Sequence, residues 1–277
     1  MREKKTIRTR FAPSPTGDLH LGGALCALAS FEIARGDPRG AFVVRMEDLD
    51  TPRVVAGSAE RILDDLAWLG MRADEYYVQS TRISIYENAL AVLERAGLTY
   101  PCDCSRAEIA RHLERVASAP HDEYDAAYPG TCREKDPSRA MRRPPAIRFR
   151  AREAGVDDFV LRRGDSVFAY QLAVSVDDLA MAISVVVRGE DLAPSTPRQI
   201  AVMRALGARD EELPRYVHLP LARDARGERL SKRTAGGRIR ALRDGGLAAK
   251  EILEVLARAT DGKTPLVVPD AWARFGA

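Results

Sequence analysis

The chain has 277 residues, of which 45% are hydrophobic, so it can bury a substantial core within one or two domains. It has no run of about 18 apolar residues and no apolar signal region after its first residues, so we expect a cytoplasmic protein with no membrane span. Its formal net charge of +3 is small but unevenly distributed.

A strand, a tight turn and the start of a helix are predicted near the beginning of the chain. Residues 7–10 have strand character, Pro13 and Pro15 end the strand, and Gly17 turns the chain into a helical stretch at 21–34. Cys26, inside this helix, is predicted to belong to the core.

Gly22 and Gly23 lie where this helix begins, and without Cβ atoms they leave its first N–H groups open to a phosphate. His20 can donate a ring N–H to a triphosphate without adding a fixed charge. The alternative is an ordinary glycine-rich turn.

Residues 41–46 predict a second strand, which implies a parallel α/β sheet. Ligands gather at the carboxyl ends of such strands, so Glu47 and Asp48 should lie on the same rim as His20. The alternative is that these acids only cap a loop or helix.

Packing elements follow. The apolar spacing predicts a helix over 57–69 containing a core Trp68, a strand at 76–78, and a helix capped by Thr81 that ends at Ala96.

Cys102 and Cys104 can hold one tetrahedral Zn²⁺ from a tight turn, and Cys132 could close the site. On chemistry alone, His112 and His121 are the generic candidates for the fourth ligand. The alternative is three buried thiols without a metal. A helix capped by Ser105 should follow the first two cysteines.

The next region predicts a half-buried strand at 146–150 and a hairpin over 158–170 that turns at 164–165. Residues 171–178 are almost continuously hydrophobic, which favours a central strand covered on both faces.

A further buried strand is predicted at 183–188, ending in Arg188, before a helix that opens at Thr196 and Pro197. Arg188 could form a structural salt bridge, or its planar fork could hold a substrate carboxylate. A strand from 216 precedes the basic loop 224–233, and 247–259 has helical composition.

Two stretches carry a local excess of positive charge. Residues 133–163 contain ten Lys or Arg against five Asp or Glu, and residues 223–243 contain eight against two. They could contact a phosphate backbone or could simply form a solvated surface.

Several motifs in order resemble those of class I aminoacyl-tRNA synthetases of the glutamyl group. They are the nucleotide motif at 10–23, with Gly23 in place of its last histidine, the Arg-Met-Glu-Asp at 45–48, the stretches 168–174 and 186–192, and the signature lysine loop at 229–233.

The resemblance implies a Rossmann-like core that activates glutamate to glutamyl-adenylate with ATP and Mg²⁺. It implies glutamate contacts from Arg10, Phe11, Ala12, Pro13, Ser14, Glu47, Tyr170 and Arg188. It implies ATP contacts from His20, Gly22, Gly23 and Lys232, of which His20 and Lys232 stabilise the reacting phosphates.

Cys-x-Cys followed by Tyr-x-x-x-Cys also resembles the zinc site of the short glutamyl-queuosine tRNA(Asp) synthetases, which implies Tyr128 as the fourth ligand beside Cys102, Cys104 and Cys132. That group transfers glutamate to the queuosine base of tRNA(Asp). We therefore expect a monomeric ligase whose partners are L-glutamate, ATP and queuosine-bearing tRNA(Asp). The alternatives are a minimal enzyme that charges tRNA(Glu) and a noncatalytic binding module.

The expected fold class is α/β, with a parallel sheet split by a zinc-containing insertion and a short helical tail. The expected segments are 1–100 and 166–225 for the two halves of the catalytic domain, 101–165 for the insertion, and 226–277 for the lysine loop and tail. Because few residues follow Lys232, we expect no anticodon-binding domain.

Overall fold

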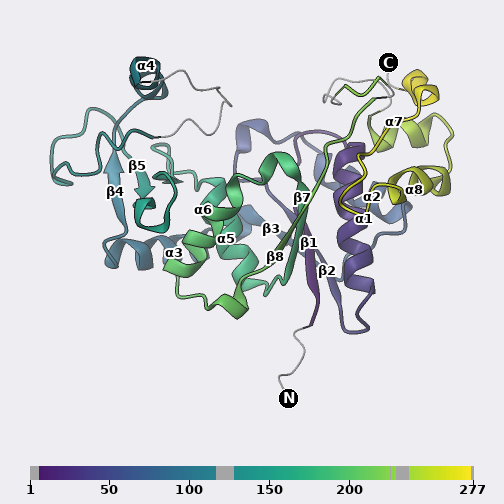
Figure 1. Ribbon diagram of the computed structural model, residues 1–277, viewed down its shortest axis with the longest axis horizontal. Coiled ribbons are helices and arrows are strands. Elements are labelled where there is room, and N and C mark those ends of the chain that lie inside the picture. Colours follow the sequence, from purple (N-terminus) through teal and green to yellow (C-terminus); the bar gives the residue numbers. More distant parts are fainter. Residues whose placement is uncertain (1–5, 117–127, 225, 229–236, 276–277) are drawn as a thin grey trace. The chain divides into compact units, whose positions relative to one another are not determined.

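The computed structural model describes residues 6–116, 128–224, 226–228 and 237–275 (Figure 1). The chain divides into two compact units. The first unit comprises Met1–Thr81, Met181–Pro194 and Pro214–Ala277, and the second comprises Arg82–Ala180 and Ser195–Leu213.

A five-stranded parallel sheet forms the centre of the first unit. Its strands are β1 (Arg8–Phe11), β2 (Ala41–Met46), β3 (Glu75–Val78), β7 (Val185–Gly189) and β8 (Arg215–Leu219). They are ordered β3-β2-β1-β7-β8, and every neighbouring pair is parallel. The parallel α/β sheet predicted from the sequence is therefore confirmed, and all five carboxyl ends lie at the same edge.

The helices of the first unit are α1 (Leu21–Arg35), α2 (Ser58–Trp68), α7 (Ile239–Asp244) and α8 (Ala249–Ala257). Helix α1 packs against β1, β2 and β7 on one side and against α8 on the other (Figure 1). Because it is covered on both sides, α1 is apolar around most of its circumference. Cys26, on α1, packs against this core as predicted.

The two faces of the sheet differ because side chains alternate along each strand. One face, under α1, carries the main core, with Phe42, Val44, Val187 and Leu219. The opposite face carries a smaller cluster built on Val43 and Val186, together with Met181 and Ile183. Polar residues follow this smaller cluster toward the carboxyl ends of the strands.

Among its described residues, the second unit contains an antiparallel sheet and four helices. The strands, in spatial order, are β4 (Thr99–Cys102), β5 (Ala146–Phe149) and β6 (Phe159–Arg162). The helices are α3 (Ile83–Arg95), α4 (Arg106–Val116), α5 (Tyr170–Ala180) and α6 (Ser195–Ala205). The chain turns back after β6, and Arg162 bridges Phe168, which confirms the predicted hairpin.

Short 3-10 turns complete both units. They are η1 (Thr51–Arg53), η2 (Gln79–Arg82), η3 (Arg152–Ala154), η4 (Glu190–Leu192), η5 (Asp210–Glu212) and η6 (Asp270–Phe275). Among the helices described, none combines the length and the apolar character needed to cross a membrane.

Two local predictions are wrong. Residues 171–178 do not form a central strand but lie within α5, whose residues from Leu172 to Asp178 are all buried against α3, α6 and β6. A helix that is buried all round has no polar stripe, so its hydrophobic run cannot be told from a buried strand. Thr81 does not cap α3. It lies in η2, where its hydroxyl donates to the carbonyl of Val78 at the end of β3, and Arg82 occupies the N-cap position of α3.

A buried carboxylate holds the second unit together near its sheet. Asp158 accepts hydrogen bonds from the Tyr100 hydroxyl at 2.7 Å, from the Ala151 backbone N–H at 2.8 Å, and from Arg133. Burial alone would raise the pKa of Asp158, but the bonds from Arg133 and Tyr100 outweigh it and hold that pKa below its ordinary value. Arg133 directly follows Cys132, so this network also anchors one of the predicted metal ligands.

Candidate active site and metal centre

Three arginines extend from the same face of the parallel sheet. The register pairs Arg10 of β1 with Val43 and Val186, and Arg188 of β7 lies two residues beyond Val186. Arg45 of β2 likewise lies two residues beyond Val43. Because side chains two apart share a face, all three arginines lie on the face opposite α1, toward the carboxyl ends of their strands.

Arg10 and Arg188 are almost fully buried, each with 4% of its surface exposed. Arg10 Nη1 donates to the Val187 carbonyl at 3.1 Å, so the guanidinium of one strand is tied to the backbone of the next. Arg188 packs against side chains of β8. The structure therefore brings these two predicted glutamate ligands onto neighbouring strands.

Arg45 was not singled out from the sequence, although it is the largest fully buried side chain among those described. Its Nη2 donates to Glu47 Oε1 at 3.1 Å. The Glu47 backbone N–H donates to the Pro13 carbonyl at 2.9 Å, which ties the end of β2 to the loop after β1. The signal was present in the sequence, since Arg45 and Glu47 are spaced to share one face of a strand.

The loop after β1 contains the other predicted glutamate contacts of this unit. Phe11 is buried at the end of the strand, Ala12 and Pro13 are half-buried, and Ser14 is exposed. Tyr170 belongs to the second unit, where it begins α5 and is one of the more exposed large side chains.

His20 is the N-cap of α1, as the predicted helix start requires. Its Nδ1 accepts from the Gly23 backbone N–H at 2.9 Å, so a neutral ring carries its proton on Nε2. An added Cβ at Gly23 would lie 3.1 Å from Leu19 Cδ1 and 3.5 Å from the imidazole, and one at Gly22 would lie 3.4 Å from Nδ1. A Cβ at Gly23 would therefore crowd Leu19, whereas its distances to the imidazole, like those of a Cβ at Gly22, are ordinary van der Waals contacts.

The segment after the basic loop returns to this helix start. Leu21 N–H donates to the Gly237 carbonyl and Ile239 N–H donates to the Leu19 carbonyl, both at 2.8 Å. Lys232 itself lies outside the described residues.

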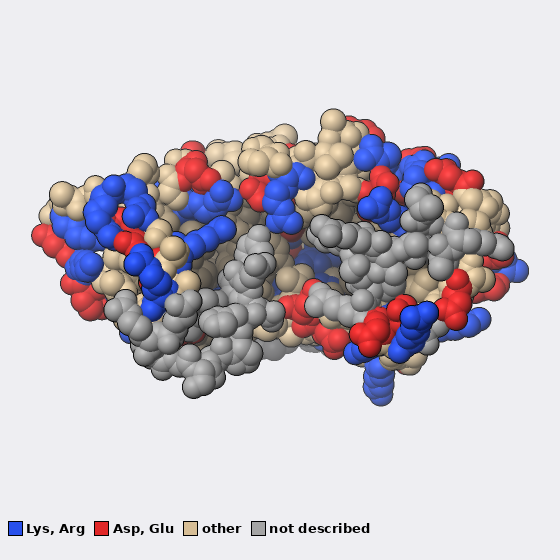
Figure 2. All heavy atoms as spheres, turned by 90° about the horizontal axis from the view of Figure 1, so that it is seen from above, with Lys and Arg blue, Asp and Glu red and all other residues tan. Residues whose placement is uncertain are grey.

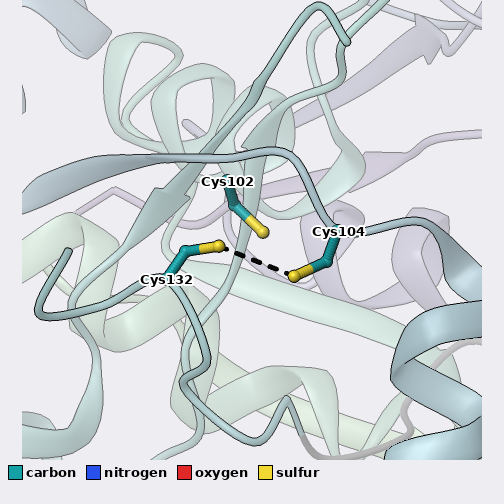
Figure 3. Close-up of side chains that lie close together, drawn as sticks. All are labelled: Cys102, Cys104 and Cys132. Atoms are coloured by element: carbon teal, nitrogen blue, oxygen red, sulfur yellow. Dashed lines mark hydrogen bonds between the residues drawn. The ribbon is translucent and has the colours of Figure 1, made fainter. Parts of the chain in front are cut away.

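Three thiols of the second unit converge. The Sγ atoms of Cys102, Cys104 and Cys132 lie within 4.8 Å of one another and point toward a common centre (Figure 3). Cys102 comes from the end of β4, Cys104 from the following turn, and Cys132 from the segment after Tyr128. The Tyr128 hydroxyl lies 3.2 Å from Cys102 Sγ and 3.8 Å from Cys104 Sγ, and Cys104 and Cys132 Sγ are 3.5 Å apart.

These distances can be compared with a tetrahedral zinc site. With Zn–S of about 2.3 Å and Zn–O of about 2.0 Å, neighbouring ligand atoms are about 3.8 Å apart for two sulfurs and about 3.5 Å for sulfur and oxygen. The three separations given, 3.2, 3.8 and 3.5 Å, each lie within about 0.3 Å of the corresponding edge. The four side chains therefore fit one Zn²⁺ with little rearrangement.

Burial works against negative charge on two of these ligands, Cys104 and Tyr128, whereas a neighbouring N–H donor and a guanidinium work in its favour. The Cys132 backbone N–H donates to the Tyr128 hydroxyl at 2.9 Å, and the Arg148 guanidinium lies 3.7 Å above the Tyr128 ring centroid. Burial raises the pKa of Cys104 to about 12, and burial together with the hydrogen bond to Cys102 raises that of Tyr128. A bound cation would reverse this preference, and its binding would release protons.

The histidines considered for the fourth ligand are placed differently. His112 lies on α4 and does not belong to the group of metal-binding side chains found among the described residues. His121 lies outside the described residues. In the described geometry, the Tyr128 hydroxyl lies beside the thiols of Cys102 and Cys104.

Most of the arginines in the basic stretch at 133–163 are paired with acids, either within the stretch or at Asp103 and Glu108. Six of its arginines form ion pairs with acidic side chains, namely Arg133, Arg139, Arg142, Arg143, Arg150 and Arg163. Asp103 alone receives Arg139 and Arg142. Basic and acidic side chains accordingly lie next to one another on the face in Figure 2.

The chain matches the family model of class I tRNA synthetases (E and Q), catalytic domain, over residues 6–155 and 134–262. Its fold agrees with solved structures of such enzymes. The glutamate–tRNA synthetase of Elizabethkingia anophelis superposes with a TM-score of 0.78 over 98% of this chain and 70% of that protein, at 24% identity. The chain belongs to the class I tRNA synthetases of the glutamyl and glutaminyl (E and Q) type.

Curated relatives with one shared name are similar to this chain over most of its length. A protein of Nitratidesulfovibrio vulgaris named glutamyl-Q tRNA(Asp) synthetase is 43% identical, with 96% of this chain and 89% of that protein covered. A protein of the same name from Burkholderia cenocepacia is 45% identical over 97% of both chains.

Proposed function

We propose that this protein activates L-glutamate with ATP and transfers it to the queuosine base in the anticodon loop of tRNA(Asp). The observation that carries the proposal is the polar face of the parallel sheet, where Arg10, Arg188 and Glu47 extend from three neighbouring strands. Two buried arginines and a carboxylate match the two carboxylates and the ammonium of an acidic amino acid.

Each group has a role in this proposal. Arg10 and Arg188 bind the carboxylates of glutamate, and Glu47, held by Arg45, receives its ammonium group. Further contacts come from the loop after β1 and from α5, namely Phe11, Ala12, Pro13, Ser14 and Tyr170. The same loop would then fix the substrate close to the helix that binds ATP.

The phosphates of ATP are held at the start of α1. Gly22 and Gly23 bring the helix N-terminus close to them, and His20 directs its Nε2–H outward because Nδ1 faces the helix. The glutamate carboxylate oxygen attacks the α-phosphorus, and the bond to pyrophosphate breaks. Lys232 and Mg²⁺ neutralise the charge that gathers on the leaving pyrophosphate.

Zn²⁺ in this proposal is structural and is held by Cys102, Cys104, Tyr128 and Cys132. Its chemistry there is to cross-link β4 to the segment containing Cys132. We assign this site to an insertion at 101–165 between the catalytic segments 1–100 and 166–225, with 226–277 forming the lysine loop and helical tail. The enzyme would act as a monomer in the cytoplasm.

The acceptor assignment is supported by the relatives, which are named glutamyl-Q tRNA(Asp) synthetases. This chain aligns with nearly their whole length. The test uses labelled glutamate, ATP, tRNA(Glu) and two tRNA(Asp) preparations, with and without queuosine. We expect label only on the queuosine-bearing tRNA, and nuclease mapping should place it in the anticodon loop. Label at the 3′ end of tRNA(Glu) would instead identify a minimal glutamyl-tRNA synthetase.

The activation step is tested separately by glutamate-dependent ATP–pyrophosphate exchange. We expect exchange in the wild type and its loss in Lys232→Ala. Lys250 lies on α8 with an exposed side chain, so Lys250→Ala is the matched control and should retain exchange. A wild type without any exchange would contradict the proposed activation.

A further inference from the structure

Strand β8 places an aromatic pair beside Arg188. The register pairs Arg188 directly with His218, and Tyr216 lies two residues earlier on the same face. Arg188 Nε donates to His218 Nε2 at 3.4 Å, and the guanidinium carbon lies 4.9 Å from the Tyr216 ring centroid. The rings of Tyr216 and His218 are nearly parallel, with an interplanar angle of 8° and 6.2 Å between their centroids.

This arrangement constrains the plane of the guanidinium. An arginine held only by its stem can rotate about its last torsions, whereas a bond at Nε and a ring beside the guanidinium fix its orientation. With Nε engaged by His218, the two terminal nitrogens are the pair that can meet a carboxylate bidentately.

We propose that His218 is a positioning residue that orients Arg188 for the carboxylate of glutamate and so sets the affinity for this substrate. The inference rests on the proposed function, because it takes Arg188 as a glutamate ligand. His218 itself need not touch the substrate.

The contact requires a neutral imidazole. His218 Nε2 accepts a hydrogen bond, so the ring proton is on Nδ1, and a second proton would remove the acceptor and place two positive charges side by side. Burial, and then the charge of Arg188, lower the pKa of His218 below its ordinary value of 6.5. Other ionisable groups on β8 and on the elements packed against it include Tyr216 and Arg215 of β8 and Glu190 and Asp191 of η4.

Two substitutions separate the hydrogen bond from the packing. His218→Phe keeps a ring that can stack on Tyr216 but removes the acceptor. His218→Gln places an amide oxygen near the position of Nε2 and restores an acceptor that does not titrate. Both proteins are first compared with the wild type by circular dichroism and thermal denaturation.

The measurement is ATP–pyrophosphate exchange as a function of glutamate and, separately, of ATP. We expect His218→Phe to raise the KM for glutamate by roughly 10- to 50-fold, as for a lost bond to a charged group, with the KM for ATP unchanged. His218→Gln should restore the glutamate KM to near the wild-type value. In the wild type this KM should rise as the pH falls through the lowered pKa of His218, and in His218→Gln that rise should be absent.

Other outcomes overturn the inference. If His218→Phe shows the wild-type glutamate KM, or if it changes the KM for both substrates and His218→Gln does not restore them, then His218 does not position Arg188. These results all presuppose exchange by the wild type. Absence of exchange in the wild type contradicts the proposed function and is thereby distinguished from failure of this inference.

Discussion

Replacement of Asp158 by asparagine should destabilise the second unit strongly. The carboxylate is fully buried and accepts from the Tyr100 hydroxyl, the Ala151 N–H and Arg133, whose own side chain is only 8% exposed. Asparagine has a single acceptor oxygen, and its NH₂ group is a donor that would face the donors now bound by the second carboxylate oxygen. The main remaining acidic partner of Arg133 would be Glu153, which is 73% exposed and holds the charge weakly.

The magnitude follows from these losses. Removing one member of a buried, hydrogen-bonded ion pair costs about 3–5 kcal/mol, which also covers the unsatisfied donors. Opening of the unit should therefore become roughly 10²- to 10⁴-fold more frequent. Hydrogen–deuterium exchange of the zinc-loaded protein, resolved on β4, β5 and β6, measures this opening. Tryptophan fluorescence would not report on it, because both tryptophans, Trp68 and Trp272, lie in the other unit.

Asp157→Asn is the matched control, since Asp157 is the adjacent acid and is exposed. It should exchange like the wild type. The effect of Asp158→Asn should be constant at neutral pH, because the folded-state pKa of Asp158 is lowered and its stabilisation is present above the unfolded pKa of about 3.9. The stabilisation should disappear as the pH falls through the lower folded-state value. Equal exchange in the two variants would refute the reasoning.

Three further predictions concern the two sites. Cys132→Ser should lack zinc by elemental analysis while Cys26→Ser, in the core of the other unit, retains it; stoichiometric zinc in Cys132→Ser would place the ligands elsewhere. Glu47→Gln should raise the glutamate KM in exchange assays about 100-fold because a charge-assisted bond is lost, and an unchanged KM would exclude an ammonium contact. His20→Ala should lower the exchange kcat by about 10² with little effect on the glutamate KM, and the reverse pattern would assign His20 to glutamate.

Much of the first unit could be predicted because its signals are local. Prolines and glycines mark the turn between β1 and α1, and the predicted bounds of β2 agree with those observed. The second unit contains the error at α5, where the deciding fact is what surrounds the segment. Burial on all sides comes from α3, α6 and β6, which are distant in sequence, so the segment alone could not reveal it.

The site shows the same division between local and distant information. Arg10, Glu47 and Arg188 stand at the ends of predicted strands and could be named from the sequence. The contact of Arg188 with His218 depends on the register of β7 and β8, which are separated along the chain by α6. The sequence predicts His218 only as one residue of an apolar strand. Its contact with Arg188 becomes visible once β7 and β8 are paired.

The rigidity of the arginines bears on how the proposed glutamate site would discriminate between acidic amino acids. Each guanidinium is already tied within the protein, Arg10 to the Val187 carbonyl, Arg45 to Glu47 and Arg188 to His218. Ordering a free arginine costs about 2 kcal/mol of rotamer entropy, and here that loss occurs on folding rather than on binding. Strand-borne ligands at fixed spacing cannot follow a shorter substrate, so aspartate, with one methylene fewer, would engage one carboxylate at the expense of the other.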